Sequence, residues 1–321
     1  MNESLEDFTL GKRIQPKGII QKIGLIGCGM VGQEITIAIS TSGLDVIFLD
    51  TDSDRIKEII DQISVQLDEV IKHWGLTTSE KRAILSRIKG TIDYEDLADC
   101  DVVIESISSR KRGTSIEIRK EIFRKVEQVV RHDAIISSNI TTLMISDLAS
   151  VLKHPDRAIG IHFILPVQKA NVVEVVRGIS SSEYAYNQAI KFAGMIDKKV
   201  IHLNESPGNI VTRMLVTTIN EACELLMEGV ASVKDIDFAM KESFSNLYGP
   251  FEMADRIGLD KVLKYMDNLY MEFGDKKYKP APIIKRLVRA NYLGKITGKG
   301  FYNYQSGKAV DQTVTLSMIK K

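Results

Sequence analysis

Residues 22–50 read KIGLIGCGMVGQEITIAISTSGLDVIFLD, and this stretch decides the fold of the chain. A short apolar run, KIGLI, breaks into a glycine-rich turn, after which apolar residues recur at helical spacing as far as Gly43. A second apolar run, LDVIFLD, ends at Asp50. The pattern predicts a strand, a tight turn, a helix and a second strand, which together form one βαβ unit.

The turn of this unit carries the pattern G-x-G-x-x-G, made by Gly27, Gly29 and Gly32. The first glycine allows the tight turn, the second lets backbone amides approach a pyrophosphate, and the third lets helix and strand pack closely. Three glycines alone are a weak signal, but the flanking strand and helix agree with them. We therefore expect the turn, including Met30 and Val31, to bind a dinucleotide.

Asp50 stands 23 residues after Gly27, at the end of the second strand. A carboxylate at this position accepts hydrogen bonds from the ribose hydroxyls of a dinucleotide and repels a 2′-phosphate, which favours NAD over NADP. Arg55 is near enough in sequence to accept such a phosphate, so NADP stays open as an alternative.

Beyond residue 50, short apolar runs alternate with amphipathic stretches, which predicts an α/β fold with a doubly wound Rossmann sheet. After residue 205 the pattern is helical only, which predicts an all-helical C-terminal domain. The expected domains are a polar N-terminal extension (1–21), an NAD-binding Rossmann domain (22–205) and a helical substrate and dimerisation domain (206–321). The expected later strands are 101–105, 134–138 and 158–163, and the expected later helices are 54–90 as a hairpin broken near Gly75, 117–130, 220–227 and 233–241.

The composition excludes several classes of function. The 321 residues carry a formal net charge of +1, so no overall attraction to nucleic acid or to an anionic membrane is expected. The first 20 residues lack the apolar stretch of a secretory signal or membrane span. Three widely separated cysteines fit no zinc spacing, which favours reduced thiols in a cytoplasmic protein without a metal.

Six ordered blocks behind the nucleotide-binding unit carry a more specific signal, and with them the chain resembles the L-3-hydroxyacyl-CoA dehydrogenase (3-hydroxybutyryl-CoA dehydrogenase) family. The resemblance implies NAD-dependent, reversible oxidation of an L-3-hydroxyacyl-CoA to the 3-oxoacyl-CoA, a place in fatty acid metabolism, and a homodimer formed through the helical domain. The blocks are SNITTL (138–143), GIHFILP (160–166), VVEVV (172–176), PGNIVTRML (207–215), GPFEMADRIGLD (249–260) and LGKITGKGFYNY (293–304).

The resemblance makes His162 the catalytic base and Glu174 the carboxylate that orients it. His162 follows a strand-like run and precedes a turn, and histidine titrates in the range that proton transfer from an alcohol requires. Glu174 follows 12 residues later and would stabilise the imidazolium. The alternatives are a histidine satisfied in the core and a strand-end carboxylate exposed to water.

The chain departs from the family where the substrate is expected. Thr141 replaces a serine and keeps the hydroxyl, so it is a catalytic candidate that can hydrogen-bond the reacting oxygen, and with Asn139 it is expected to shape the nicotinamide end. Thr212, also a catalytic candidate, stands where the family has an asparagine that positions the substrate near the thioester carbonyl, and Leu165 also replaces an asparagine. Asn209 replaces an aromatic residue one helical turn earlier, so its amide is a candidate substitute in substrate binding. These changes predict an active enzyme with an atypical substrate, and the alternative is a catalytically impaired homologue.

Further basic residues are candidates by position alone. Arg119 aligns with a family residue near the cofactor, and Lys72 falls in a helix whose basic residues contact coenzyme A in the family. An ordinary surface lysine explains Lys72 equally well. The run 110–112 could attract the phosphates of coenzyme A, although such a charge run is more often a solvated surface loop.

Two other functions remain open from the sequence. One is oxidation of a hydroxyacyl group on an acyl carrier protein, or of a small hydroxy acid, which the replaced asparagines motivate. The other is a non-catalytic NAD-binding homologue.

Overall fold

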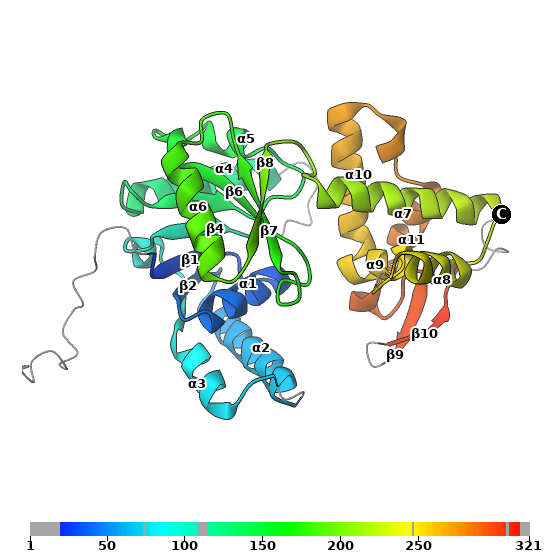
Figure 1. Cartoon of the computed structure of the whole chain (residues 1–321), viewed down its shortest axis with the longest axis horizontal. Helices are drawn as coiled ribbons and strands as arrows, with labels where there is room; N and C mark the ends of the chain where they lie inside the picture. Colours follow the sequence, from blue (N-terminus) through cyan, green and yellow to red (C-terminus); the bar gives the residue numbers. More distant parts are fainter. Residues whose placement is uncertain (1–19, 73–74, 108–114, 246, 306–307, 315–321) are drawn as a thin grey trace, which may run out of the picture. The chain divides into compact units, whose positions relative to one another are not determined.

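The computed structural model of the chain describes residues 20–72, 75–107, 115–245, 247–305 and 308–314 (Figure 1). The chain forms two compact units. The first unit extends to Asn139 and includes Leu148–Val175 and Ser180–Ile201, and the second consists of Ile140–Asp147, Val176–Ile179 and the chain from His202 onward. The predicted N-terminal extension, apart from residues 20 and 21, and the basic run 110–112 lie outside the described residues.

An eight-stranded sheet has the order β3-β2-β1-β4-β5-β6-β7-β8. Each pair of neighbouring strands from β3 to β6 in this order is parallel. The order reverses beside β1, which is the switch point at which doubly wound sheets bind ligands. The predicted Rossmann topology is therefore confirmed. The strands are β1 (Lys22–Ile26), β2 (Asp45–Leu49), β3 (Ile88–Thr91), β4 (Val102–Glu105), β5 (Ile135–Ser138), β6 (Ala158–Phe163), β7 (Val172–Arg177) and β8 (Lys199–Asn204).

Helices connect these strands. The long helix α2 buries one stripe against the sheet unit, formed by Ile59, Ile63 and Leu67 at a spacing of four residues. The helices before residue 205 are α1 (Met30–Thr41), α2 (Ser53–Lys72), α3 (Thr78–Ser86), α4 (Ser115–Val129), α5 (Ile145–Ala149) and α6 (Glu183–Met195), with 3₁₀ turns at Tyr94–Leu97 and Pro155–Arg157.

The helical hairpin predicted for 54–90 ends earlier than expected, since β3 takes the last residues and pairs with β2. Gly90 lies opposite Phe48 in this pairing, and a Cβ at Gly90 would lie 2.8 Å from the Phe48 ring. The glycine therefore serves the packing of an edge strand, which helical spacing does not reveal.

The second unit is helical, as predicted, and in addition carries an antiparallel hairpin of β9 and β10 that the sequence analysis did not predict. The rings of Phe251 and Phe301 lie 4.5 Å apart in its core. Its elements are α7 (Val211–Glu228), α8 (Val233–Phe244), α9 (Pro250–Ile257), α10 (Leu259–Phe273), η4 (Lys276–Tyr278), α11 (Pro282–Arg289), η5 (Lys295–Thr297), β9 (Tyr302–Gln305) and β10 (Lys308–Gln312).

Two buried carboxylates join the hairpin to the helices of the second unit. Asp237 accepts hydrogen bonds from the amides of Phe251 and Glu252 and from the Tyr302 hydroxyl. Asp255 accepts from the amides of the residue before β9 and of the first residue of β9, and from a tyrosine hydroxyl of the same strand. Burial raises the pKa of Asp237 and of Asp255 to about 6.

In the part of the chain that the structure describes, no helix is both long enough and apolar enough to cross a membrane.

Candidate functional site

The glycine turn has the geometry that a dinucleotide pyrophosphate requires. Gly27 has φ of +88°, and a Cβ there would lie 2.7 Å from Ile107. A Cβ at Gly32 would lie 2.4 Å from the carbonyl oxygen of Gly27, so only glycine lets α1 approach the turn. Gly29, in contrast, faces open space, with nothing within 4 Å of the position of a Cβ.

The N-terminus of α1 begins beside that space. Gly29 is its N-cap and no side chain caps the helix, which leaves the first-turn amides, among them those of Met30 and Val31, to an outside acceptor. Met30 is 54% exposed. The residues of the turn therefore fit the phosphates of a dinucleotide, although contacts of individual residues with NAD stay a prediction.

Asp50 follows β2 directly and faces the same turn. Its Oδ2 accepts a hydrogen bond from the Cys28 amide at 3.0 Å, and its Oδ1 accepts from the Thr51 amide. Oδ2 retains a lone pair for a ribose hydroxyl, whereas Oδ1 also accepts from the Thr51 hydroxyl at 3.4 Å. The guanidinium of Arg55 lies 2.9 Å from Glu58, and this ion pair reduces its availability to a 2′-phosphate.

His162 and Glu174 form a direct pair. His162 is in β6 and Glu174 in β7, which are neighbours in the sheet, and Nδ1 of the histidine lies 2.6 Å from a carboxylate oxygen of the glutamate. Glu174 is fully buried and His162 is 8% exposed. A buried carboxylate on Nδ1 fixes the imidazole orientation and favours the tautomer that is protonated on Nδ1.

Asn139 ties three strand ends together beside this pair. Its amide donates to the carbonyl of Glu105 at 2.7 Å, at the end of β4. Its side-chain oxygen accepts from the amide of Phe163 at 2.9 Å, next to His162, and its side-chain nitrogen donates to Ser106. Asn139 therefore holds the backbone that carries His162, and the nicotinamide contact expected from the sequence stays a prediction.

Glu105 is a residue that the sequence analysis did not single out. It is 1% exposed at the end of β4, and it accepts hydrogen bonds from Arg119, from the Ser138 hydroxyl and from the Ile107 amide. Arg119 also donates to the carbonyl of Ile107 at 2.7 Å. The guanidinium is thus fixed at the same sheet edge as Gly27, and its contact with the cofactor stays a prediction. The sequence feature that could have identified Glu105 is its position as a charged residue at the end of the apolar run DVVIE.

Three candidate substrate residues belong to the second unit: Thr141, Asn209 and Thr212. Thr212 is buried in the first turn of α7. Asn209 precedes that helix with φ of +48°, and its side-chain nitrogen is buried without a hydrogen-bond partner among the described residues. Such a donor costs free energy unless a ligand satisfies it, which agrees with the predicted substrate amide.

Two more predicted residues are exposed. Lys72 ends α2 and lies 2.5 Å from Glu69 in an exposed ion pair. Leu165 is 38% exposed in the loop after β6 and is joined to Pro166 by a cis peptide bond. A role for either in binding substrate stays a prediction.

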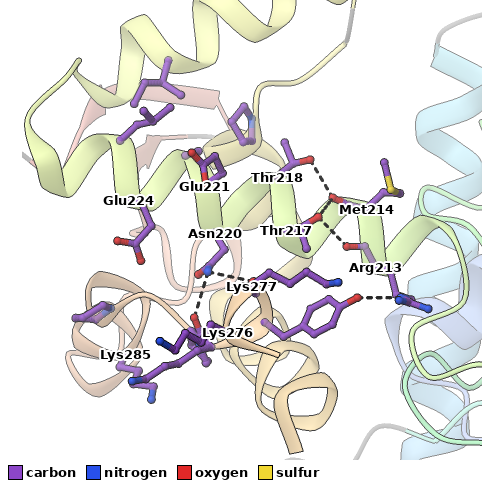
Figure 2. A pocket seen from close by; sticks show the side chains of 18 of the residues that line it. Arg213, Met214, Thr217, Thr218, Asn220, Glu221, Glu224, Lys276, Lys277 and Lys285 are labelled. Atoms are coloured by element: carbon purple, nitrogen blue, oxygen red, sulfur yellow. Dashed lines mark hydrogen bonds between the residues drawn. The ribbon is translucent and has the colours of Figure 1, made fainter. Parts of the chain in front are cut away.

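The second unit contains one large groove of about 1330 Å³, between α7, α8 and the segment from η4 to α11. Figure 2 shows Met214, Glu221 and Glu224 on the α7 side and Lys276 and Lys285 on the other. Asn220 closes the floor, since its side chain bonds the carbonyls of Lys277 and Lys279. Among the described residues, no group of histidine, cysteine, aspartate and glutamate side chains is arranged to hold a metal ion.

Comparison with known proteins matches residues 22–206 to the family described as "3-hydroxyacyl-CoA dehydrogenase, NAD binding domain" and residues 208–304 to "3-hydroxyacyl-CoA dehydrogenase, C-terminal domain". A 3-hydroxybutyryl-CoA dehydrogenase of Bradyrhizobium diazoefficiens is 36% identical over 91% of this chain and 98% of its own length. One of Clostridioides difficile is 35% identical over 88% and 99%. The crystal structure of (S)-3-hydroxybutyryl-CoA dehydrogenase from Ralstonia eutropha is similar, with a TM-score of 0.81 and 36% identity over 90% of this chain and all of that one.

Proposed function

The chain belongs to the 3-hydroxyacyl-CoA dehydrogenase family, and on that premise we propose that it interconverts an L-3-hydroxyacyl-CoA and the 3-oxoacyl-CoA with His162 as the base and Glu174 as its support. The single observation that carries the roles is the 2.6 Å contact between His162 Nδ1 and a fully buried Glu174 carboxylate. The pair stands in the same unit as the glycine turn and Asp50. Within this proposal, residues 22–205 bind NAD and residues 206–321 serve substrate binding and dimerisation.

The mechanism follows from the protonation of the histidine. With its Nδ1 proton held by Glu174, the imidazole presents Nε2 as the nitrogen that takes the hydroxyl proton of the substrate. Bound NAD supplies the hydride acceptor for the carbon that carries this hydroxyl. Glu174 stabilises the positive charge that then develops on His162. In the reverse direction the imidazolium returns the proton to the 3-oxo oxygen.

The test is NADH-linked turnover of acetoacetyl-CoA and of a longer 3-oxoacyl-CoA by the wild type and by His162→Ala. We expect turnover in the wild type, and a loss of at least about 100-fold in the variant with unchanged NADH affinity. Equal turnover in both proteins would refute His162 as the base. NADH binding without turnover in either protein would favour the non-catalytic homologue.

A second candidate substrate is a hydroxyacyl group on a carrier protein or a free hydroxy acid. It is favoured by Thr212, which lacks the amide of the family's asparagine, and by the unsatisfied side-chain nitrogen of Asn209. The same assay with acetoacetyl-carrier protein and with acetoacetate distinguishes the substrates. Turnover of acetoacetyl-CoA at ordinary efficiency, with the others unused, would reject this alternative.

We further propose a homodimer whose contact is the groove of the second unit. Met214 is 67% exposed at its edge, and large exposed apolar surface marks interaction sites. The groove presents Glu221 and Glu224 on one wall and Lys285, Arg286 and Arg289 on the other. A symmetric pair of copies would place each wall against the opposite charge of its partner.

Light scattering at micromolar concentration tests the dimer. We expect twice the chain mass for the wild type, a monomer for Met214→Asp, and no change for Met271→Asp, since Met271 is 83% exposed but does not line the groove. A monomeric wild type would reject the proposal. The cytoplasm is the proposed compartment, which the three buried, unpaired cysteines support, and fatty acid metabolism is the proposed context.

A further inference from the structure

The loop between β6 and β7, residues 164–171, joins the two members of the catalytic pair, since His162 precedes it and Glu174 follows it. The loop turns tightly, because the amides of Lys169 and Ala170 both donate to the carbonyl of Pro166 at 3.0 Å. Any displacement of this loop changes the backbone on which His162 and Glu174 stand. What holds the loop therefore bears on catalysis.

Two charged side chains hold the centre of the loop from opposite sides. The amide of Val167 donates to Oε2 of Glu34 at 2.7 Å, across 133 residues of sequence. The carbonyl of Val167 accepts from Nζ of Lys198 at 2.9 Å, and the same ammonium donates to the carbonyl of Ala170. The Val167 side chain is 1% exposed, so packing fixes the residue as well. The backbone of one residue, Val167, is thus held at its amide by an acid and at its carbonyl by a base.

Both charged groups are partly withdrawn from water, and the structure gives neither of them an ion pair within the described residues. Burial raises the pKa of Glu34 and lowers the pKa of Lys198. A neutral acceptor and donor would satisfy the same backbone groups at a lower desolvation cost. The charged pair gives shorter and stronger hydrogen bonds, which suits a loop that has to keep one conformation.

Glu34 links the loop to the cofactor helix. It is the fifth residue of α1, one turn after the N-terminus at which Gly29 faces open space. The preceding residue, Gln33, fixes α1 to α2, because its side-chain oxygen accepts from Gln66 at 2.7 Å and its nitrogen donates to Gln62 at 2.6 Å. Helix α1 is therefore a firm base for the contact with the loop.

We propose that Glu34 is a positioning residue that, through the Val167 amide, fixes the catalytic loop to the helix that binds NAD, with Lys198 completing the clamp. The inference rests on the proposed function. In this proposal, Glu34 and Lys198 keep the distance between the hydride acceptor and His162 constant. A displacement of about 1 Å in such a spacing costs up to about 100-fold in rate.

The first experiment follows backbone hydrogen exchange of residues 164–171 in the NADH complex, in the wild type, Glu34→Ala, Glu34→Gln and Lys198→Met. We expect faster exchange of the Val167 amide in Glu34→Ala and Lys198→Met, and near wild-type protection in Glu34→Gln, whose amide oxygen still accepts the bond. This readout does not depend on the substrate, so it tests the clamp even if acyl-CoA proves not to be turned over.

The second experiment measures kcat, KM and NADH affinity in the same proteins. We expect Glu34→Ala to lower kcat about 10- to 100-fold with KM and NADH affinity within about threefold, and Glu34→Gln to restore most of kcat. The control is Glu121→Ala, an exposed ion-pair residue of α4, which should match the wild type. Unchanged exchange and unchanged kcat in Glu34→Ala would overturn the proposal. So would a Glu34→Gln variant as impaired as Glu34→Ala.

Discussion

Replacement of Glu174 by glutamine is the sharpest test of the His162 pair. Glutamine has nearly the same volume and still accepts the Nδ1 hydrogen bond through its side-chain oxygen, so the orientation of the imidazole survives. What is lost is the negative charge. Because Glu174 is fully buried and its oxygen lies 2.6 Å from Nδ1, this charge acts on the imidazolium without screening by water.

The size of the loss follows from Coulomb's law. Two unit charges about 4 Å apart, at an effective dielectric constant of about 20, attract by about 4 kcal/mol. The imidazolium is only partly formed in the transition state, so part of this energy is expressed in the rate. If a third to two thirds of this energy is expressed, kcat should fall about 10- to 10²-fold, since each 1.4 kcal/mol or so corresponds to a factor of ten.

The assay follows NADH absorbance during oxidation of L-3-hydroxybutyryl-CoA at saturating substrate, together with NADH affinity and the thermal unfolding midpoint. Glu121→Gln, a change in an exposed ion pair of α4, provides the matched control and should retain kcat within about twofold. A Glu174→Gln enzyme that keeps kcat within threefold of the wild type would refute the electrostatic reasoning.

Three further predictions concern the cofactor turn and the second unit. Asp50→Ala should weaken NAD binding about 10-fold and reduce discrimination against NADP, as fluorescence titration would report; unaltered NAD affinity would contradict the ribose contact. Gly32→Ala should destabilise the fold by about 1–3 kcal/mol and abolish NADH binding, because its Cβ would lie 2.4 Å from the Gly27 carbonyl, whereas Gly194→Ala, with nothing within 4 Å, should unfold like the wild type. The raised pKa of Asp237, about 6 in the fold against 3.8 ordinarily, means that its contribution to stability is present below about pH 4 and lost as the pH rises through about 6. The melting temperature of Asp237→Asn should therefore change less between about pH 4 and pH 6 than that of the wild type. An equal change of melting temperature with pH in both proteins would contradict the raised pKa of Asp237.

The sequence predicted the first βαβ unit and the Rossmann topology because both depend on local patterns. The three glycines, the apolar runs and Asp50 lie within 29 residues, and each has a distinct steric or chemical task. Strands β3, β7 and β8 and the β9–β10 hairpin escaped prediction. Apart from β7, whose four central residues are buried, they are only partly buried, so their pairing partners rather than their own apolar spacing define them.

The candidate site likewise contains contacts that the sequence predicted and contacts that it did not. The pairing of His162 with Glu174 was expected from the resemblance, and the structure adds the distance and the burial. The contacts of Glu105 with Arg119 and of Glu34 with Val167 were not expected. They join positions 14 and 133 residues apart, and a lone glutamate in a sequence gives no sign of its distant partner.

Of the four departures from the family pattern named above, three lie in the second unit and one, Leu165, lies in the first. Thr141, Asn209 and Thr212 belong to the second unit, whereas the glycine turn, Asp50 and the His162 pair belong to the first and retain the family's residue types. In the proposed mechanism, hydride and proton transfer depend on the first set, and recognition of the acyl group is expected from Asn209 and Thr212 of the second. If the first-unit residues are intact and the second-unit residues have changed, the enzyme should prefer different acyl groups. The ratio of kcat/KM between acyl groups measures this preference. Restoring the family asparagine in Thr212→Asn should shift those ratios towards short acyl-CoA substrates and leave NADH affinity unchanged; identical ratios in both proteins would show that Asn209 or another group already fills that role.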